Sequence, residues 1–125
     1  VPKECTALAE LVAAEHGNIH RSLDLSPAAM LRLLQRCDAL RKPERFAQAL
    51  WACECDARGR WGFEAAAYPQ RGRLAQALAV ALGVATGPIA AQAVAAGKQG
   101  AAIGQAVDAV RVQALGQWLK TGESS

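Results

Sequence analysis

The chain has 125 residues, of which 52% are hydrophobic and 20% are charged, and its formal net charge is +3. This composition excludes a disordered tail and supplies enough apolar material for one packed domain. Ala, Leu and Val dominate the apolar residues and only 5% of the chain is aromatic, so strong helix formers prevail. We therefore predict an all-α fold, a bundle of about six helices. No run of about 18 apolar residues is uninterrupted, and we expect no membrane partner.

Helix signals follow one another along the chain. The clearest is Ser26 followed by Pro27, because serine caps free amides and proline suits the first helical position. The first helix is expected to end near Gly17 and Asn18. The expected helices cover about 2–15, 27–41, 43–57, 71–82, 88–97 and 100–121.

Apolar residues recur every three or four positions in these segments, which indicates one inward face per helix. The residues expected on these faces are Leu8, Leu11 and Val12; Met30, Leu31, Leu33, Leu34, Cys37 and Leu40; Phe46, Ala49, Leu50, Cys53 and Ala57; Leu74, Leu78 and Leu82; and Ile103, Val107, Val110, Ala114 and Trp118.

Residues 58–70 form a predicted loop that contains more charged and aromatic residues than a simple turn requires. The loop combines arginines, glycines, three aromatic residues and a proline. Burial of the aromatic rings would stiffen it, and Arg58 and Arg60 would then be held ready to grip phosphates or carboxylates through forked hydrogen bonds. The alternative is a structural corner whose arginines pair with Asp56 and Glu64.

Positive charge is concentrated in the middle of the chain. Residues 32–73 carry eight arginines and one lysine against five carboxylates. Arginine favours geometric recognition of phosphate over diffuse attraction. The excess is smaller than that of an autonomous nucleic-acid-binding domain, and a solvated helix face would have a similar composition.

A second anion site is predicted at Gly97-Lys98-Gln99-Gly100, where a glycine-rich turn leads into the last helix. Free amides and the helix dipole at such a place attract phosphate, and Lys98 adds a charge. The alternative is a helix corner that needs glycine only for close packing.

The four cysteines, at positions 5, 37, 53 and 55, lack the CxxC spacing of a zinc or redox site. We expect free thiols in a reducing, cytoplasmic environment.

His16 and His20 lie four apart and are candidate metal ligands if one helix carries both, but the expected helix end at Gly17 separates them. No motif for a nucleophile, a phosphate-binding loop or paired catalytic carboxylates is present, so we predict no catalytic residues.

Several motifs occur together in a known family. They are Arg41-Lys42-Pro43-Glu44-Arg45, Cys55-Asp56-Ala57-Arg58-Gly59-Arg60, Gly62-Phe63-Glu64, Tyr68-Pro69-Gln70 and Ala96-Gly97-Lys98-Gln99-Gly100. With these motifs the chain resembles the C-terminal part of bacterial CCA-adding tRNA nucleotidyltransferases, in the group that also carries an HD phosphohydrolase domain. The resemblance covers nearly the whole chain.

The resemblance implies that residues 1–22 are the closing helix of the HD domain and that residues 23–125 form a helical tRNA-binding domain. It places the nucleotide-binding head, which uses magnesium with CTP and ATP, upstream of this sequence. The chain alone is therefore expected to be inactive and to hold no cofactor. The implied partner is tRNA, and the residues expected to contact it are Arg58, Arg60, Arg71, Arg73 and Lys98.

Two other hypotheses remain open at this point. One is a helical scaffold and dimerisation surface, with a second copy as its partner in a homodimer, whose arginines mostly form internal ion pairs. The other is a remnant of a metal-dependent phosphohydrolase that uses His16 and His20.

Overall fold

The computed structural model describes residues 3–59 and 67–123, and within these ranges the chain is helical, with no strand. This confirms the predicted all-α bundle of about six helices. The elements are α1 (Lys3–His20), the 3-10 turn η1 (Ser22–Asp24), α2 (Pro27–Arg36), α3 (Pro43–Arg58), α4 (Pro69–Leu82), α5 (Thr86–Ala95) and α6 (Ala101–Glu123).

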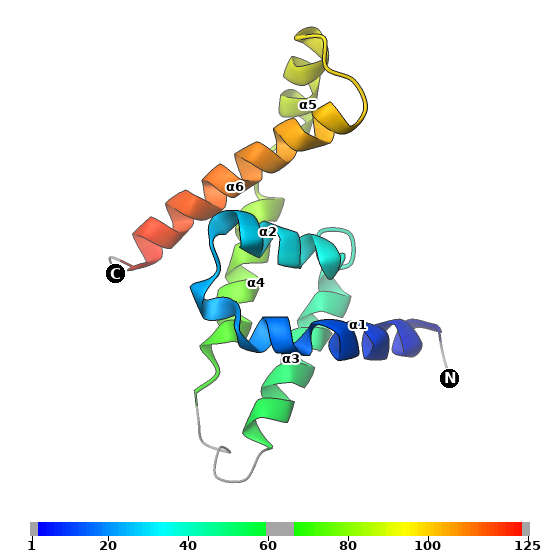
Figure 1. The fold of residues 1–125 in the computed structure, drawn as a ribbon, viewed down its shortest axis with the longest axis vertical. Coiled ribbons are helices and arrows are strands. Elements are labelled where there is room, and N and C mark those ends of the chain that lie inside the picture. The colour runs from blue at the N-terminus through cyan, green and yellow to red at the C-terminus, as the bar shows by residue number, and fades with distance from the viewer. Residues whose placement is uncertain (1–2, 60–66, 124–125) are drawn as a thin grey trace.

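The helices form a body with a projecting arm (Figure 1). Helices α1 to α4 make the body, while α5 and the first half of α6 pack against each other and extend away from it. The second half of α6 returns along α2 and α4, and α1 packs on α3. The C-terminal end of α3 and the α5–α6 corner therefore lie at opposite ends of the molecule.

No single described helix is long and apolar enough to cross a membrane, although α4 and α5, bent by 49°, reach that length and apolarity together.

The core lies where α2, α3, α4 and the end of α1 meet α6. The predicted inward faces of α2 and α3 are confirmed: their buried residues are Met30, Leu31, Leu33, Leu34, Phe46, Ala49, Leu50 and Cys53. The predicted stripe of α6 is only half-buried. The fully buried residue among the described positions of α6 is Leu115, which lies outside that stripe.

The prediction that Leu82 points inward is wrong, because this side chain is 46% exposed. Leu82 lies eight residues after Leu74, and eight residues rotate a helix by about 80° beyond two full turns. The buried positions of α4 follow the spacing of three, four and seven, so Ala77 and Ala81 complete the face that Leu74 and Leu78 begin.

Helix α1 continues to His20, so its predicted end near Gly17 is wrong. Side chains bridge the weak point: the Asn18 amide donates to Glu15 Oε1 at 3.1 Å, and Arg21 Nη2 donates to Asn18 Oδ1 at 3.2 Å. Arg21 also lies so close to Gly17 that an added Cβ there would be 3.2 Å from its Nη1. These contacts, worth about 0.2–0.5 kcal/mol each, and the packing of α1 on α3 offset the roughly 1 kcal/mol that glycine costs inside a helix.

Helix α2 ends at Arg36, before the predicted end. The amide of Ala39 donates to the Leu34 carbonyl at 2.9 Å, and that of Asp38 donates to the Gln35 carbonyl at 3.0 Å. This pair of bonds is the Schellman motif, which requires a left-handed residue and usually takes glycine. Here Asp38 occupies the position with a φ of 54°, so no glycine marks the helix end in the sequence.

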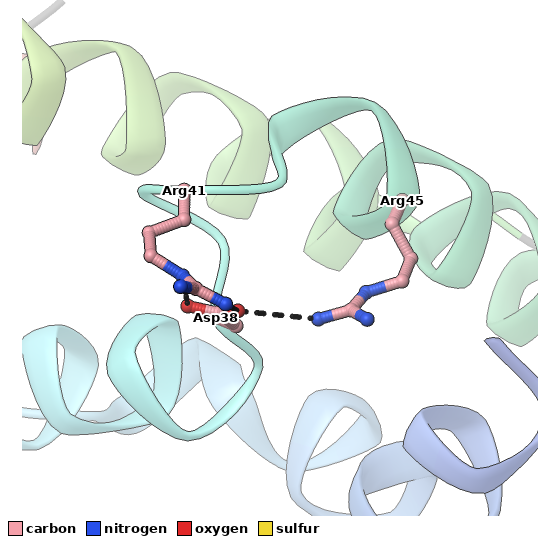
Figure 2. Close-up of polar contacts among 3 residues, drawn as sticks. All are labelled: Asp38, Arg41 and Arg45. Atoms are coloured by element: carbon pink, nitrogen blue, oxygen red, sulfur yellow. Dashed lines mark hydrogen bonds and ion pairs between the residues drawn. The ribbon is translucent and has the colours of Figure 1, made fainter. Parts of the chain in front are cut away.

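The Asp38 side chain braces the turn between α2 and α3 (Figure 2). Its carboxylate accepts hydrogen bonds from Arg41 Nε at 2.9 Å and from Arg41 Nη2 at 2.8 Å, and Arg45 Nη2 lies 3.5 Å away. The hydrogen bonds from Arg41 hold the pKa of Asp38 below its usual value. One carboxylate therefore connects the end of α2 to the first turns of α3.

We predict that Phe46→Ala lowers the free energy of unfolding by about 3–5 kcal/mol, because a fully buried ring is lost and a cavity remains. Trp51→Ala on the same helix, where the side chain is 58% exposed, should change it by less than about 0.5 kcal/mol. Urea unfolding of both variants checks this. Similar losses in the two variants would contradict the assignment of the buried face of α3.

We predict that Asp38→Asn is less stable than the wild type only while the carboxylate is charged. Because the folded-state pKa of Asp38 is lowered, its contribution is fully present above the unfolded pKa of about 3.9 and is lost as the pH falls through the folded pKa. Urea unfolding at several pH values should show a constant gap above about pH 5 that closes in acid. A gap that does not depend on pH would mean that the charge of Asp38 is unimportant for the turn.

Candidate nucleic-acid interface

The predicted RNA-binding residues do not form one cluster. Arg58 ends α3, Arg71 and Arg73 lie in the first half of α4, and Lys98 lies in the corner between α5 and α6 at the other end of the molecule. Arg60 falls outside the described residues. Any interface that uses all of these side chains would have to extend along the length of the fold.

Arg58 and Arg71 come together around one carboxylate. Glu54 Oε2 lies 3.7 Å from Arg58 Nε, one turn along α3, and Glu54 Oε1 lies 3.6 Å from Arg71 Nη1 on α4. The Glu54 side chain is 17% exposed, whereas the two arginines are 47% and 45% exposed. Each guanidinium has five N–H donors, so a single carboxylate leaves both arginines with donors for an incoming anion.

Arg73 has a different environment. Two residues apart on a helix, Arg71 and Arg73 face different sides. The guanidinium carbon of Arg73 lies 5.9 Å from the centroid of the Trp118 ring on α6, a cation–π contact. Arg73 is half-buried, and its Nε is buried without a hydrogen-bond partner. This side chain therefore joins α4 to α6, which agrees better with a structural role than with the predicted RNA contact.

Tyr68 fastens the start of α4 to the end of α1. Its hydroxyl lies 2.7 Å from His20 Nδ1, and the Gln70 side chain donates to the His20 carbonyl at 2.8 Å. Burial raises the pKa of Tyr68, so the hydroxyl keeps its proton and can donate. His20 Nε2 lies 3.5 Å from Asp56 Oδ2. Sequence reasoning singled out Tyr68 but missed its partner, since the two residues are 48 positions apart and nothing in the sequence signals the contact.

His16 and His20 share a face of α1 because the helix is continuous. Their rings meet edge to face with centroids 5.8 Å apart, and His16 Nδ1 lies 3.1 Å from the Val12 carbonyl oxygen. Within the described part of the chain, no group of three or more His, Cys, Asp or Glu side chains is placed to hold a metal ion. The His20 ring instead contacts the Tyr68 hydroxyl.

The corner at Gly97 and Gly100 needs glycine for its backbone angles. Their φ values are 88° and 56°, in the region that favours glycine. A Cβ at either position would meet nothing within 4 Å, so the alternative of close packing is wrong. The amide of Lys98 donates to the Ala93 carbonyl at 3.0 Å, and the Lys98 side chain is exposed.

Some amides predicted to bind an anion at this corner already have partners. The amide of Ala102 donates to the Gln99 carbonyl at 3.2 Å, and that of Ile103 donates to the Gly100 carbonyl at 3.1 Å. The exposed ammonium of Lys98 therefore remains the main attraction for a phosphate at this place.

All four cysteines are free thiols, as predicted; Cys37 and Cys53 are buried, while Cys5 and Cys55 are exposed. Burial raises the pKa of Cys37 to about 12 and that of Cys53 to about 11. Both buried thiols are therefore protonated at neutral pH and are poor nucleophiles.

Comparison with known proteins confirms the resemblance found in the motifs. The Multifunctional CCA protein of Polaromonas naphthalenivorans (strain CJ2) is 61% identical over 94% of this chain. The proteins of the same name from Acidovorax sp. (strain JS42) and Verminephrobacter eiseniae (strain EF01-2) are 56% and 58% identical over 95% of it. The chain spans only 28–29% of the length of these relatives, so it corresponds to one part of such a protein. No family model and no solved structure matches it.

We predict that Tyr68→Phe lowers the free energy of unfolding by about 1 kcal/mol, because the hydrogen bond to His20 is lost. The loss should largely disappear when His20 is replaced first, since the two side chains form one interaction. A double-mutant cycle with His20→Phe, followed by urea unfolding, measures this coupling. Additive effects of the two substitutions would contradict the contact.

Proposed function

We propose that this chain is the tRNA-binding part of a CCA-adding tRNA nucleotidyltransferase. Support comes from the relatives named Multifunctional CCA protein, which match nearly the whole chain at 56–61% identity. In this proposal the whole enzyme adds C and A residues to the tRNA 3′ end in the cytoplasm, using CTP, ATP and magnesium. Its nucleotide-binding part lies outside these 125 residues, so the chain alone is inactive.

The observation that carries this proposal is the arrangement of Arg58 and Arg71 around Glu54. Two half-exposed guanidiniums from different helices face one mostly covered carboxylate. Exposed ion pairs of this length stabilise a fold little, but forked donors held side by side suit phosphate oxygens. Contacts to phosphate position RNA without reading its sequence, as an enzyme acting on every tRNA requires.

Residues 1–22 would belong to an associated HD phosphohydrolase domain. Helix α1 supports this by its exposure: it packs on α3, but Ile19 is its one fully buried side chain among the described residues. In the whole enzyme, HD-domain residues would cover the remainder of α1.

A scaffold or dimerisation role is the second candidate. The Arg73–Trp118 contact favours it, because this arginine already has a structural partner. The exposed apolar side chains Leu82 and Val94, 46% and 58% exposed, would then lie at an interface between two copies.

We predict weak, salt-sensitive tRNA binding by the chain. Arg58→Ala/Arg71→Ala should lower the affinity about tenfold. The slope of log affinity against log salt should become shallower by about 1 to 2, because a variant that makes fewer phosphate contacts releases fewer counterions on binding. Arg32→Ala, an exposed arginine on α2, is the matched control and should change neither quantity.

Filter binding or fluorescence anisotropy at 50 and 200 mM salt measures both quantities. If the folded chain binds no tRNA at either salt and sediments as a dimer, the scaffold role replaces the proposed one. If binding persists undiminished in the double variant, Arg58 and Arg71 are not the RNA contacts.

A further inference from the structure

A second basic surface lies at the other end of α3 from Arg58. It is an open cleft of about 640 Å³ between the start of α1 and the turn before α3. The lining residues are Lys3, Ala7, Arg41, Lys42, Pro43, Glu44, Arg45 and Gln48. Four of these side chains are cationic and only Glu44 is acidic.

The polar contacts of this cleft leave it with excess positive charge. Asp38 accepts hydrogen bonds from Arg41 and lies 3.5 Å from Arg45, so it orients two guanidiniums and neutralises about one of them. The Nε of Arg45 is buried without a hydrogen-bond partner. Lys42 lies near enough to Asp38 for their charges to interact, but neither Lys3 nor Lys42 belongs to a salt bridge among the described residues. Among the described lining residues and Asp38, four cations face two carboxylates, and the N-terminus of α3 adds a partial positive charge.

The exposed face of α3 connects this cleft to Arg58. Residues at a spacing of four, three, four and three follow one side of a helix. The residues at this spacing, all exposed, are Glu44, Gln48, Trp51, Cys55 and Arg58. We call this line of residues the α3 stripe; its length is about 21 Å, from the rise of 1.5 Å per residue.

Trp51 lies at the centre of the α3 stripe and is 58% exposed. Glu44 precedes it by seven residues and Arg58 follows it by seven, so all three lie within about 40° of one another around the helix axis. Glu44 and Gln48 of the stripe also line the cleft, so along the helix the exposed ring lies between the basic cleft and Arg58. Single-stranded nucleic acid binds to such combinations, in which bases stack on aromatic rings and cations hold the backbone.

We propose that the α3 stripe is an RNA-binding surface on which Trp51 stacks against an unpaired base and the cleft at Lys42 holds a backbone phosphate. This inference rests on the proposed function and extends the RNA contact from Arg58 along the whole helix. RNA fits better than a free nucleotide, because only an extended polyanion reaches both ends of a line about 21 Å long. Stacking also requires an unpaired base, as in the single-stranded ends and loops of RNA.

The test compares three substitutions in the full chain by tRNA titration over a series of salt concentrations. Trp51→Ala should lower the affinity about tenfold at every salt concentration without changing the salt slope, because stacking releases no counterions. Lys42→Glu should lower the affinity several-fold and make the slope shallower by about 1 or more. Lys120→Glu, the same exchange at an exposed position of α6, should change neither.

Conservative replacement and unfolding curves exclude misfolding. Trp51→Phe should recover part of the affinity that Trp51→Ala loses, and all variants should unfold at wild-type urea concentrations. Undiminished binding in both Trp51→Ala and Lys42→Glu, with binding still weakened in Arg58→Ala/Arg71→Ala, would overturn the α3 stripe and leave the proposed function intact. Absence of tRNA binding by the wild type would overturn both.

A competition experiment distinguishes the source of the phosphate. Tripolyphosphate and ATP should displace tRNA only at concentrations well above that of the RNA. Both are too short to reach more than one end of the α3 stripe at a time. If either binds the wild type more tightly than tRNA does, and Lys42→Glu abolishes that binding, the cleft is a site for free nucleotides and the RNA contact is overturned.

Discussion

The burial of one face of α3 is the constraint on which the rest of the structure depends. Phe46, Ala49, Leu50 and Cys53 are buried in the core, and a fully buried ring alone contributes several kcal/mol to stability. This burial fixes the rotation of α3 about its own axis. The opposite face, with Trp51 at its centre, is therefore directed to solvent, and the same periodicity that builds the core arranges the exposed residues in a line.

Polar contacts then hold the two ends of α3 in place. At the N-terminal end, Asp38 joins the end of α2 to Arg41 and Arg45. At the C-terminal end, Glu54 lies between Arg58 and Arg71. These contacts are partly exposed and each contributes little to stability, but they orient arginines at both ends of one rigid helix. Stability and the positioning of charge thus come from different faces of the same element.

The sequence predicted the helices and the faces of α2 and α3 well, because capping and apolar periodicity are local signals. It failed at the end of α1, where side chains around Gly17 maintain the helix, and at the end of α2, where Asp38 takes a position that usually requires glycine. Both failures arise from contacts that composition does not reveal. Leu82 was misassigned because an eight-residue spacing drifts around the helix.

The site was predictable only in part. Arg58 and Arg71 were singled out from the sequence, but their shared partner Glu54 and the Arg73–Trp118 contact depend on how α3, α4 and α6 pack. Trp51 was overlooked, although a signal was present: it falls outside the predicted inward stripe of α3 and lies seven residues from Arg58.

The central claim, that RNA lies along the exposed face of α3, can be tested with the thiols of the chain itself. Cys55 lies on that face, and Cys5 is an exposed thiol on α1. Cys5 is two residues from both Lys3 and Ala7 and so faces away from the cleft. The measurement is the alkylation rate of each thiol, by mass spectrometry, with and without tRNA. We predict that tRNA slows alkylation of Cys55 and leaves that of Cys5 unchanged; equal rates for Cys55 with and without saturating tRNA would contradict the account.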